Sequence, residues 1–440
     1  MRASLLLLLL AVCIPAHAGE LDAGRKVMLV RLPGGGIQPQ IAVDESGAVH
    51  MIYYQGDPQN GDLYYVRSRD GGASFSTPLR VNSTAGSAIA VGNIRGGHLA
   101  IGKNGRVHVA WNGSRFSGQQ GRAPMLYSRL NDAGTTFEPQ RNVIQSAYGL
   151  DGGGAVAADA AGDVYVLWHA PEPGKEGEGN RRVWIARSRD DGKTFERERA
   201  SYDQPTGACG CCGLNAFADR SGALYVLYRS AAEMVHRDMY VLVSRDKGDT
   251  FQGEDISKWK VGYCVMSSES FSWSPMGVLA AWETEKQVYY GHIDPATGKL
   301  PALIAAPGSG ENRKYPAVAA NQQGETIFVW TEGMAWKKGG RVAWQVYNKS
   351  AQPTVDHGQS EGVPAWSLVA VFARPDDGFT IVVLGLSLRR QGAGGRSPRP
   401  QLRSICDERG STRIHCSMQI RCSTRHRWNR RTTFPARVPP

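Results

Sequence analysis

A short phrase that recurs four times constrains the fold more than any other feature of this chain. Its copies run over residues 68–75, 128–137, 188–195 and 244–251, and each contains an aspartate, a glycine, a serine or threonine and a closing phenylalanine. The aspartates are Asp70, Asp132, Asp190 and Asp246, which lie 62, 58 and 56 residues apart. A nearly constant period of this size indicates a repeat architecture.

The residues of the phrase are those of a tight turn. An aspartate accepts hydrogen bonds from backbone N–H groups just ahead of it, and glycine allows positive φ where the chain reverses. A strand-like run precedes each copy, for example Leu63–Val66 and Met239–Val243. We therefore interpret the four aspartates as structural locks at hairpin tips, because catalysis does not need four copies.

A second repeat lies between these turns and predicts the number of units. Each copy reads strand, tight turn, strand, and the aligned turn glycines fall at positions 47, 105, 162, 222, 277, 324 and 378. The short β-branched and aromatic runs predict an all-β fold. We expect a β-propeller of six or seven four-stranded blades whose ring is closed by the strand Val27–Arg31.

The phrase resembles the Asp-box, or BNR repeat, of the sialidase (neuraminidase) superfamily. The resemblance covers about residues 39–384 through its period. It implies a β-propeller, and it leaves catalysis open because many non-catalytic propellers carry the same motif. If the chain is an enzyme, the resemblance implies an exo-glycosidase that acts on terminal sialic acid or a related acidic sugar.

The two ends of the chain differ from the repeats. Residues 1–18 have the pattern of a signal peptide, with Arg2, an apolar run and the small residues Ala16 and Ala18 before the cleavage point. The apolar run is too short to cross a bilayer. We therefore expect a secreted or periplasmic protein without a membrane span, whose propeller occupies residues 19–386.

Residues 387–440 form an arginine-rich segment that we expect to be disordered. It holds thirteen arginines and no lysine against Asp407 and Glu408, so its net charge of +11 equals the formal charge of the whole chain. The propeller is accordingly neutral, and we expect it to bind no nucleic acid.

Propeller topology separates the turn aspartates from the candidate site. Residues just before the first strand and just after the second strand of each blade share one face, and the Asp-boxes lie on the other. The shared face is predicted to carry Asp57, Asp62, Arg95, His98, Asn112, Asp151, His169, Cys209, Cys211, Cys212, Arg229, Arg237, Cys264, Glu269, Glu283, Arg313, Lys314, Glu332 and Trp366.

The sialidase resemblance assigns roles to some of these residues. Sialidases hold the substrate carboxylate with three arginines, use a tyrosine activated by a glutamate as nucleophile, and use an aspartate as acid/base. Carried over, these roles make Asp57, Asp62, Glu283 and Glu332 catalytic candidates and Arg229, Arg237, Arg313 and His98 substrate-binding candidates. Two positions depart from the pattern, because Ile37 stands where the first arginine is expected and Trp366-Ser367 matches the nucleophile's Tyr-Ser.

Four cysteines outside the two ends support a rival interpretation. Cys209, Cys211, Cys212 and Cys264 fall at the openings of adjacent blades. In an exported protein they are first read as disulfides. The alternative is a thiolate site for a soft metal ion such as Cu(I). No other cofactor is expected.

Three functions thus remain open. The first is a sialidase-type glycosidase whose partner is a glycan or glycoconjugate. The second is a non-catalytic propeller that binds glycan or protein. The third is a metal or redox propeller centred on the cysteines.

Overall fold

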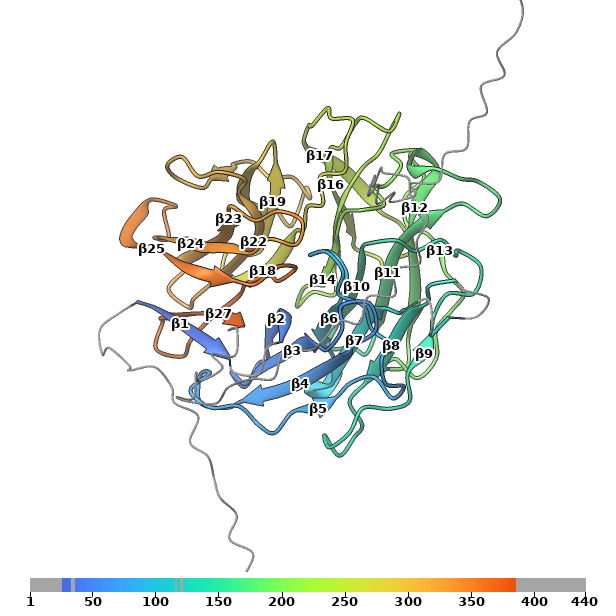
Figure 1. The fold of residues 1–440 in the computed structure, drawn as a ribbon, viewed down its shortest axis with the longest axis horizontal. Helices are drawn as coiled ribbons and strands as arrows, with labels where there is room; N and C mark the ends of the chain where they lie inside the picture. The colour runs from blue at the N-terminus through green and yellow to red at the C-terminus, as the bar shows by residue number, and fades with distance from the viewer. Residues whose placement is uncertain (1–25, 33–35, 115–116, 119–121, 385–440) are drawn as a thin grey trace, which may run out of the picture. The chain divides into compact units, whose positions relative to one another are not determined.

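A ring of seven small β-sheets makes up the part of the protein that the structure describes (Figure 1). The structure is a computed structural model, and it describes residues 26–32, 36–114, 117–118 and 122–384. Six sheets have four strands each and the seventh has three. We number these sheets as blades 1 to 7 in chain order. The prediction of a β-propeller is confirmed, and the number of blades is seven.

The strands follow one another outward in each blade, except in blade 7. Blade 1 holds β2 (Ile37–Val43), β3 (Val49–Gln55), β4 (Asp62–Ser68) and β5 (Leu79–Arg80), and blade 2 holds β6 (Gly97–Ile101), β7 (Val107–Asn112), β8 (Met125–Arg129) and β9 (Arg141–Asn142). Blade 3 holds β10 (Gly154–Ala158), β11 (Val164–Pro171), β12 (Arg181–Ser188) and β13 (Arg199–Ala200), and blade 4 holds β14 (Leu214–Ala218), β15 (Leu224–Arg229), β16 (Met239–Ser244) and β17 (Gln252–Ser257). Blade 5 holds β18 (Ser270–Ser274), β19 (Gly277–Thr284), β20 (Gln287–Ile293) and β21 (Ile304–Ala305), and blade 6 holds β22 (Lys314–Ala320), β23 (Thr326–Glu332), β24 (Gly340–Tyr347) and β25 (Pro353–Val363). Blade 7 holds β26 (Ala370–Ala373), β27 (Phe379–Leu384) and β1 (Val27–Leu32), and the short 3-10 helices η1 (Lys103–Gly105) and η3 (Glu178–Asn180) lie in connections.

The core lies between blades, so most inner strands are buried on both faces. In blade 3, Val156 and Val166 pack in the cluster shared with blade 2, whereas Ala155 and Leu167 pack in the cluster shared with blade 4. Two-sided burial explains why strand runs in this sequence are nearly continuously apolar instead of alternating. It also holds neighbouring blades in a fixed relation, which positions their openings around a common axis.

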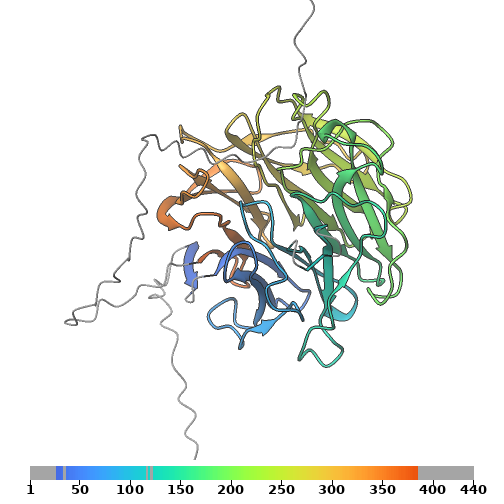
Figure 2. The same cartoon turned by 45° about the vertical axis from the view of Figure 1, so that its right-hand side comes forward.

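The first and last described strands close the ring, as predicted for residues 27–31. β1 pairs with β27 in parallel, with Val27 opposite Phe379, and the two lie side by side in both ribbon views (Figures 1 and 2). Every other strand pair is antiparallel in the described sheets. In a meander the fourth strand runs parallel to the second. β1 therefore has the direction of a fourth strand, although it pairs directly with the second.

Three of the four repeated turns are locked as the sequence predicts. In blade 3, Asp190 Oδ1 accepts hydrogen bonds from the Ser188 hydroxyl at 2.7 Å and from the backbone N–H of Thr194 at 2.8 Å. Asp70 and Asp246 make the same pair of bonds in blades 1 and 4. Burial acts to raise the pKa of each of these aspartates, but the hydrogen bonds outweigh it and lower the pKa to about 2.

At Asp132 the predicted role is wrong. Asn131 locks this turn instead, because its Oδ1 accepts the backbone N–H of Thr135 at 3.0 Å. The Asp132 side chain is 88% exposed and forms an ion pair with Arg106. The two extra residues of this copy shift the turn by one position, so that the amide oxygen occupies the place of the carboxylate.

Residues 1–18 and 387–440 lie outside the described part of the chain, so the predicted signal peptide and arginine-rich segment have no structural account. Among the described residues, none of the helices is long and apolar enough to span a membrane.

Candidate functional site

The loop that opens blade 4 sits between the ends of the strands around the axis. The Cys209 N–H donates to the carbonyl of Arg229 at the end of β15, and the Gly213 N–H donates to the carbonyl of Ser267 before β18. The loop before the first strand of blade 4 thus contacts both the end of the second strand of that blade and the opening of blade 5. This places strand openings and second-strand ends on one face, as the repeat topology predicted.

Two buried glutamates come together on this face. Glu269 precedes β18 and is 5% exposed, and Glu283 lies near the end of β19 and is fully buried. Both Glu269 carboxylate oxygens lack a hydrogen-bond partner among the described residues. Burial raises the pKa of Glu269 well above its usual value, and the charges of Cys212 and Glu283 add to this effect. The raised pKa favours the protonated form of Glu269, and the charge of Arg229 opposes the shift.

Lys314 and Tyr315 complete this group from the opening of blade 6. Lys314 Nζ is 3.1 Å from the Glu283 carboxylate and 5.5 Å from the centre of the Tyr315 ring. Burial raises the pKa of Glu283, and the charge of Lys314 opposes that shift. Burial, followed by the charges of Glu283 and Cys212, raises the pKa of the Tyr315 phenol. We call Glu269, Glu283, Lys314 and Tyr315 the axial cluster.

Tyr315 is held by a strained backbone, and its ring packs against the cluster between blades 6 and 7. Tyr315 has a φ of 51°, and the pairing of β22 with β23 shifts register between Lys314 and Ala317. Gln38 repeats this arrangement in blade 1, with a φ of 55° and a register shift at the same place in β2. A non-glycine residue in this conformation costs about 1–3 kcal/mol and is most often retained at functional sites. A bulge of this kind re-aims a side chain.

The predicted substrate-binding arginines are largely engaged by the protein itself. Arg229 is 1% exposed and donates to the Ser267 hydroxyl and to the carbonyls of Arg237 and Glu283. Arg313 donates to Gln287, Glu332 and the carbonyls of residues 306 and 307. Arg237 pairs with Glu178 at 2.6 Å, but its Nε and Nη1 lack a partner among the described residues.

The other predicted site residues lie apart from the axial cluster. Asp57 is exposed and caps the backbone N–H of Gln59, while Asp62 accepts from Asn82 and from the Gly86 N–H. Glu332 is held by Trp330, Arg313 and Arg341. Burial lowers the pKa of His98 in blade 2 to about 4. Among the predicted catalytic carboxylates, only Glu283 belongs to the axial cluster.

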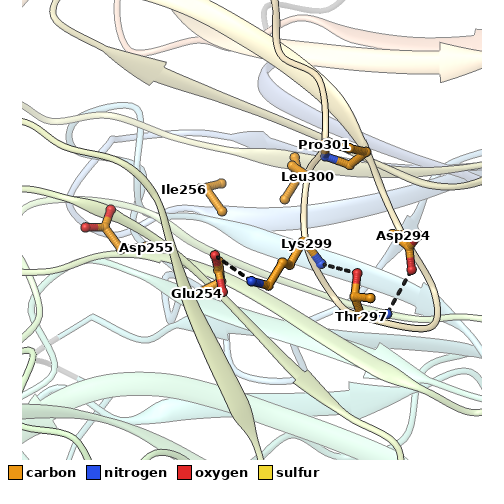
Figure 3. A pocket seen from close by; sticks show the side chains of 8 residues that line it. All are labelled: Glu254, Asp255, Ile256, Asp294, Thr297, Lys299, Leu300 and Pro301. Carbon is orange, nitrogen blue, oxygen red and sulfur yellow. Dashed lines mark hydrogen bonds and ion pairs between the residues drawn. The ribbon is translucent and has the colours of Figure 1, made fainter.

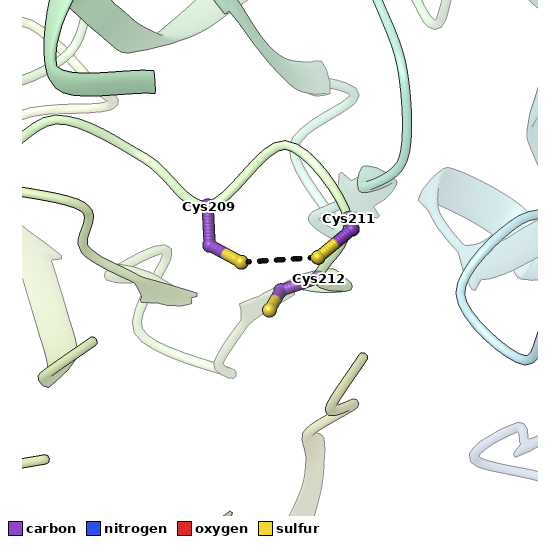
Figure 4. A group of neighbouring side chains, drawn as sticks. All are labelled: Cys209, Cys211 and Cys212. Carbon is purple, nitrogen blue, oxygen red and sulfur yellow. Dashed lines mark hydrogen bonds between the residues drawn. The ribbon is translucent and has the colours of Figure 1, made fainter. Parts of the chain in front are cut away.

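All four predicted cysteines gather in one place. Cys211 and Cys264 form a disulfide that joins the openings of blades 4 and 5, which confirms the disulfide interpretation for this pair. Cys209 and Cys212 are buried and have no disulfide partner among the described residues. The sulfurs of Cys209, Cys211 and Cys212 all lie within 4.8 Å of one another (Figure 4).

A surface depression of about 350 Å³ lies elsewhere, between β17 and the connection that follows β20 (Figure 3). Its walls include Glu254 and Lys299, whose side chains face each other at 3.9 Å. None of the predicted site residues lines it. Because the β20–β21 turn is equivalent to an Asp-box turn, this depression belongs to the face opposite the cysteines.

Sequence reasoning did not single out Tyr315, although a signal for it was available. Tyr315 and Gln38 each stand directly before a proline at the start of a first strand, as Tyr315-Pro316 and Gln38-Pro39. Aligning these two pairs would have placed Tyr315 at the axis.

Comparisons with known proteins find similarity only to solved structures of low sequence identity. No protein-family model matches the chain, and no curated protein matches it. Among solved structures, a protein of unknown function from Dyadobacter fermentans is 13% identical with a TM-score of 0.49, over 73% of this chain and 96% of that one. An α-L-arabinanase from Penicillium chrysogenum is 15% identical with a TM-score of 0.47, over 72% and 94%. Hadza microbial sialidase Hz136 is 13% identical with a TM-score of 0.44, over 74% of each chain.

The seven blades and their Asp-box turns decide the fold. The described part of the chain is a seven-bladed β-propeller with Asp-box turns. The function has to be argued from the residues of the axial face.

Proposed function

We propose that this protein is an exported glycoside hydrolase of the propeller type, acting on a terminal sialic acid or a related acidic sugar at the axial face. The observation that carries the proposal is the axial cluster, which combines a tyrosine, an ion-paired glutamate and a buried glutamate whose pKa is raised. The disulfide between Cys211 and Cys264 supports export, because disulfides persist in oxidising compartments.

The cluster divides the chemistry of glycoside cleavage among three groups. Glu269, whose pKa is raised by burial, would donate a proton to the leaving-group oxygen. Glu283 would accept the phenolic proton of Tyr315 as the tyrosine oxygen attacks the anomeric carbon. Lys314 Nζ is 3.1 Å from the Glu283 carboxylate. Its positive charge would therefore lie beside the negative charge that passes from Glu283 to the tyrosine oxygen in this proton transfer. This arrangement matches the tyrosine–glutamate pairing that the sialidase resemblance implies.

The acidic nature of the substrate is supported by positive charge on the same face, next to the buried cysteines. Arg237 has two buried nitrogens, Nε and Nη1, without partners among the described residues. An unsatisfied buried guanidinium is costly, and a carboxylate is its best-matched ligand. We therefore assign Arg237 the contact with the sugar carboxylate.

The proposal is tested by turnover of fluorogenic exo-glycosides, with a sialoside first in the panel. Tyr315→Phe removes only the phenolic oxygen and should lower kcat by about 10²–10⁴. Tyr64→Phe, on the third strand of blade 1, is the matched control and should keep wild-type kcat. Equal activity of Tyr315→Phe and wild type would remove Tyr315 from the mechanism.

A non-catalytic glycan-binding propeller is the second candidate, and burial favours it. Tyr315 is 5% exposed, Glu283 is fully buried, and Arg229 and Arg313 are fully engaged by protein acceptors. Binding to an array of acidic glycans without turnover of any member of the substrate panel would support this candidate over the hydrolase.

A further inference from the structure

The four cysteines divide into a buried pair and a surface pair. Cys209 and Cys212 are fully buried, with the spacing of a C-x-x-C motif, and they lack a disulfide partner among the described residues. Cys211 is half-buried and Cys264 is exposed, and these two form the disulfide. A reducing pair thus lies directly behind an oxidised pair that faces solvent.

The two pairs are in contact through one sulfur of each. Cys209 Sγ is 3.6 Å from Cys211 Sγ (Figure 4), which is van der Waals contact between a thiol and a disulfide sulfur. Disulfide exchange requires this approach of a thiolate to one sulfur of the bond. If Cys211 is attacked, the sulfur that leaves is that of Cys264, the exposed member of the cluster.

Positive charge surrounds the buried pair. Burial acts to raise the pKa of Cys212, but a hydrogen bond from Cys209, the charge of Arg229 and hydrogen bonds from Ser267 lower it to about 7. Arg237 acts on both buried thiols, and its Nε and Nη1 lack partners among the described residues. The hydrogen bond with Cys212 and burial nevertheless raise the pKa of Cys209, so Cys212 is the thiolate of the pair and can take the proton of Cys209. Cationic surroundings favour thiolates and nucleophilic chemistry. They disfavour a bound metal cation, and the disulfide already occupies two of the four sulfurs.

We propose that these cysteines form a thiol–disulfide relay that passes two electrons from the buried Cys209–Cys212 pair to the surface Cys211–Cys264 pair. The proposal does not depend on the glycosidase function. Its external substrate is a disulfide that reaches Cys264 at the surface, and the reaction with it is the reduction of that disulfide to two thiols.

The relay has two balanced steps. In the first, the Cys209 sulfur attacks Cys211 Sγ while its proton passes to the Cys212 thiolate. The bond between Cys211 and Cys264 breaks, and its electron pair leaves on Cys264, which takes a proton from water. In the second, the Cys212 sulfur loses its proton to solvent and attacks Cys209, and Cys211 leaves as a thiolate that is then protonated. The buried pair ends oxidised and the surface pair ends reduced.

The native protein tests the relay without any substitution. Purified full-length protein is incubated with a maleimide at pH 8, quenched with acid and mapped by mass spectrometry. The relay predicts that Cys211 and Cys264 become labelled while Cys209 and Cys212 become joined by a disulfide. A map that retains the Cys211–Cys264 bond, two intact disulfides from the start, or a stoichiometric bound metal ion would each overturn the proposal.

A substitution that stops the relay half-way gives the sharper test. In Cys212→Ser, Cys209 can still attack Cys211, but no thiol remains to resolve the Cys209–Cys211 disulfide. This disulfide should therefore accumulate, and Cys264 should be labelled in the folded protein. Cys209→Ser is the matched control, because it removes the attacking sulfur and should keep Cys264 in its original bond. Labelling of Cys264 should be at least about tenfold faster in Cys212→Ser than in Cys209→Ser. Equal rates in the two variants would contradict the relay.

Discussion

Single hydrogen-bonding atoms decide which residues of this sequence are structural. Asp190 illustrates the rule, because its carboxylate is fully occupied by Ser188 and Thr194 within its own turn. Asn131 performs the same task with an amide oxygen, so the negative charge is dispensable. Glu269 is the opposite case, since its two carboxylate oxygens have no partner among the described residues. Functional residues are therefore expected where buried acceptor atoms have no hydrogen-bond partner within the protein.

The turn aspartates allow a prediction about stability at the residue scale. Asp190→Ala removes the acceptor for three hydrogen bonds and should lower the free energy of unfolding by about 1–2 kcal/mol. Asp190→Asn should lose less, because Asn131 shows that an amide oxygen fits this turn. Thermal and urea unfolding of the two variants and wild type measure the difference, and an equal loss in both would contradict the assignment.

The same turn has a predictable pH dependence. The pKa of Asp190 is lowered to about 2 in the folded protein from 3.8. A lowered folded pKa contributes stability that is present above the unfolded value and is lost as pH falls through the folded one. The deficit of Asp190→Ala relative to wild type should accordingly shrink between pH 4 and pH 2. A constant deficit across this range would show that the carboxylate charge is not involved.

Glu269 should show the reverse sign. Its folded pKa is raised above the usual 4.5, so the stability linked to its protonation is present below pH 4.5 and is lost as pH rises through the folded pKa. Glu269→Gln should therefore lose less stability than wild type between pH 5 and pH 8, as measured by urea unfolding. The exposed Glu45→Gln should retain the wild-type slope. A variant slope equal to that of wild type would mean that Glu269 is ionised.

At the scale of elements, the closure of the ring by β1 is the most informative feature. β1 reaches blade 7 from the opposite end of the described sequence and adds Val27 and Leu29 to the cluster between blades 6 and 7. Arg31 fixes its far end by hydrogen bonds to Ser360 and to the carbonyls of residues 361 and 362. These bonds hold β1 against β25 as well as against β27.

The closure strand can be tested by its two faces. Leu29→Ala removes apolar contacts with the blade 6–7 cluster and should lower the free energy of unfolding by about 1–2 kcal/mol. Met28→Ala, on the alternate side of the same strand and outside that cluster, should cost less. Melting temperatures of the two variants provide the comparison. A larger loss for Met28→Ala would require a different register for β1.

At the scale of the whole molecule, the repeat made the fold predictable and the site only partly so. The seven turn glycines gave the correct number of hairpins, because each blade must reverse at the same place. Glu283 could be placed on the axial face because it follows a second strand. The Tyr315-Pro316 pair marked the start of a first strand, but the positive φ and the bulge at Tyr315 depend on pairing with β23 and could not be predicted from the sequence. The hydrogen bonds that occupy Arg229 could not be predicted either, because two of its acceptors are backbone carbonyls, those of residues 237 and 283.

The two faces of the ring give the most direct test of the central claim, which is that chemistry belongs to the axial face and the Asp-boxes are structural. Turnover of the glycoside panel is measured for wild type, Glu283→Gln and Asp190→Asn under conditions where all three are folded. The account predicts that Glu283→Gln lowers kcat by about 10²–10⁴ and that Asp190→Asn keeps wild-type kcat. Unchanged turnover in Glu283→Gln, or a comparable loss in Asp190→Asn, would contradict it.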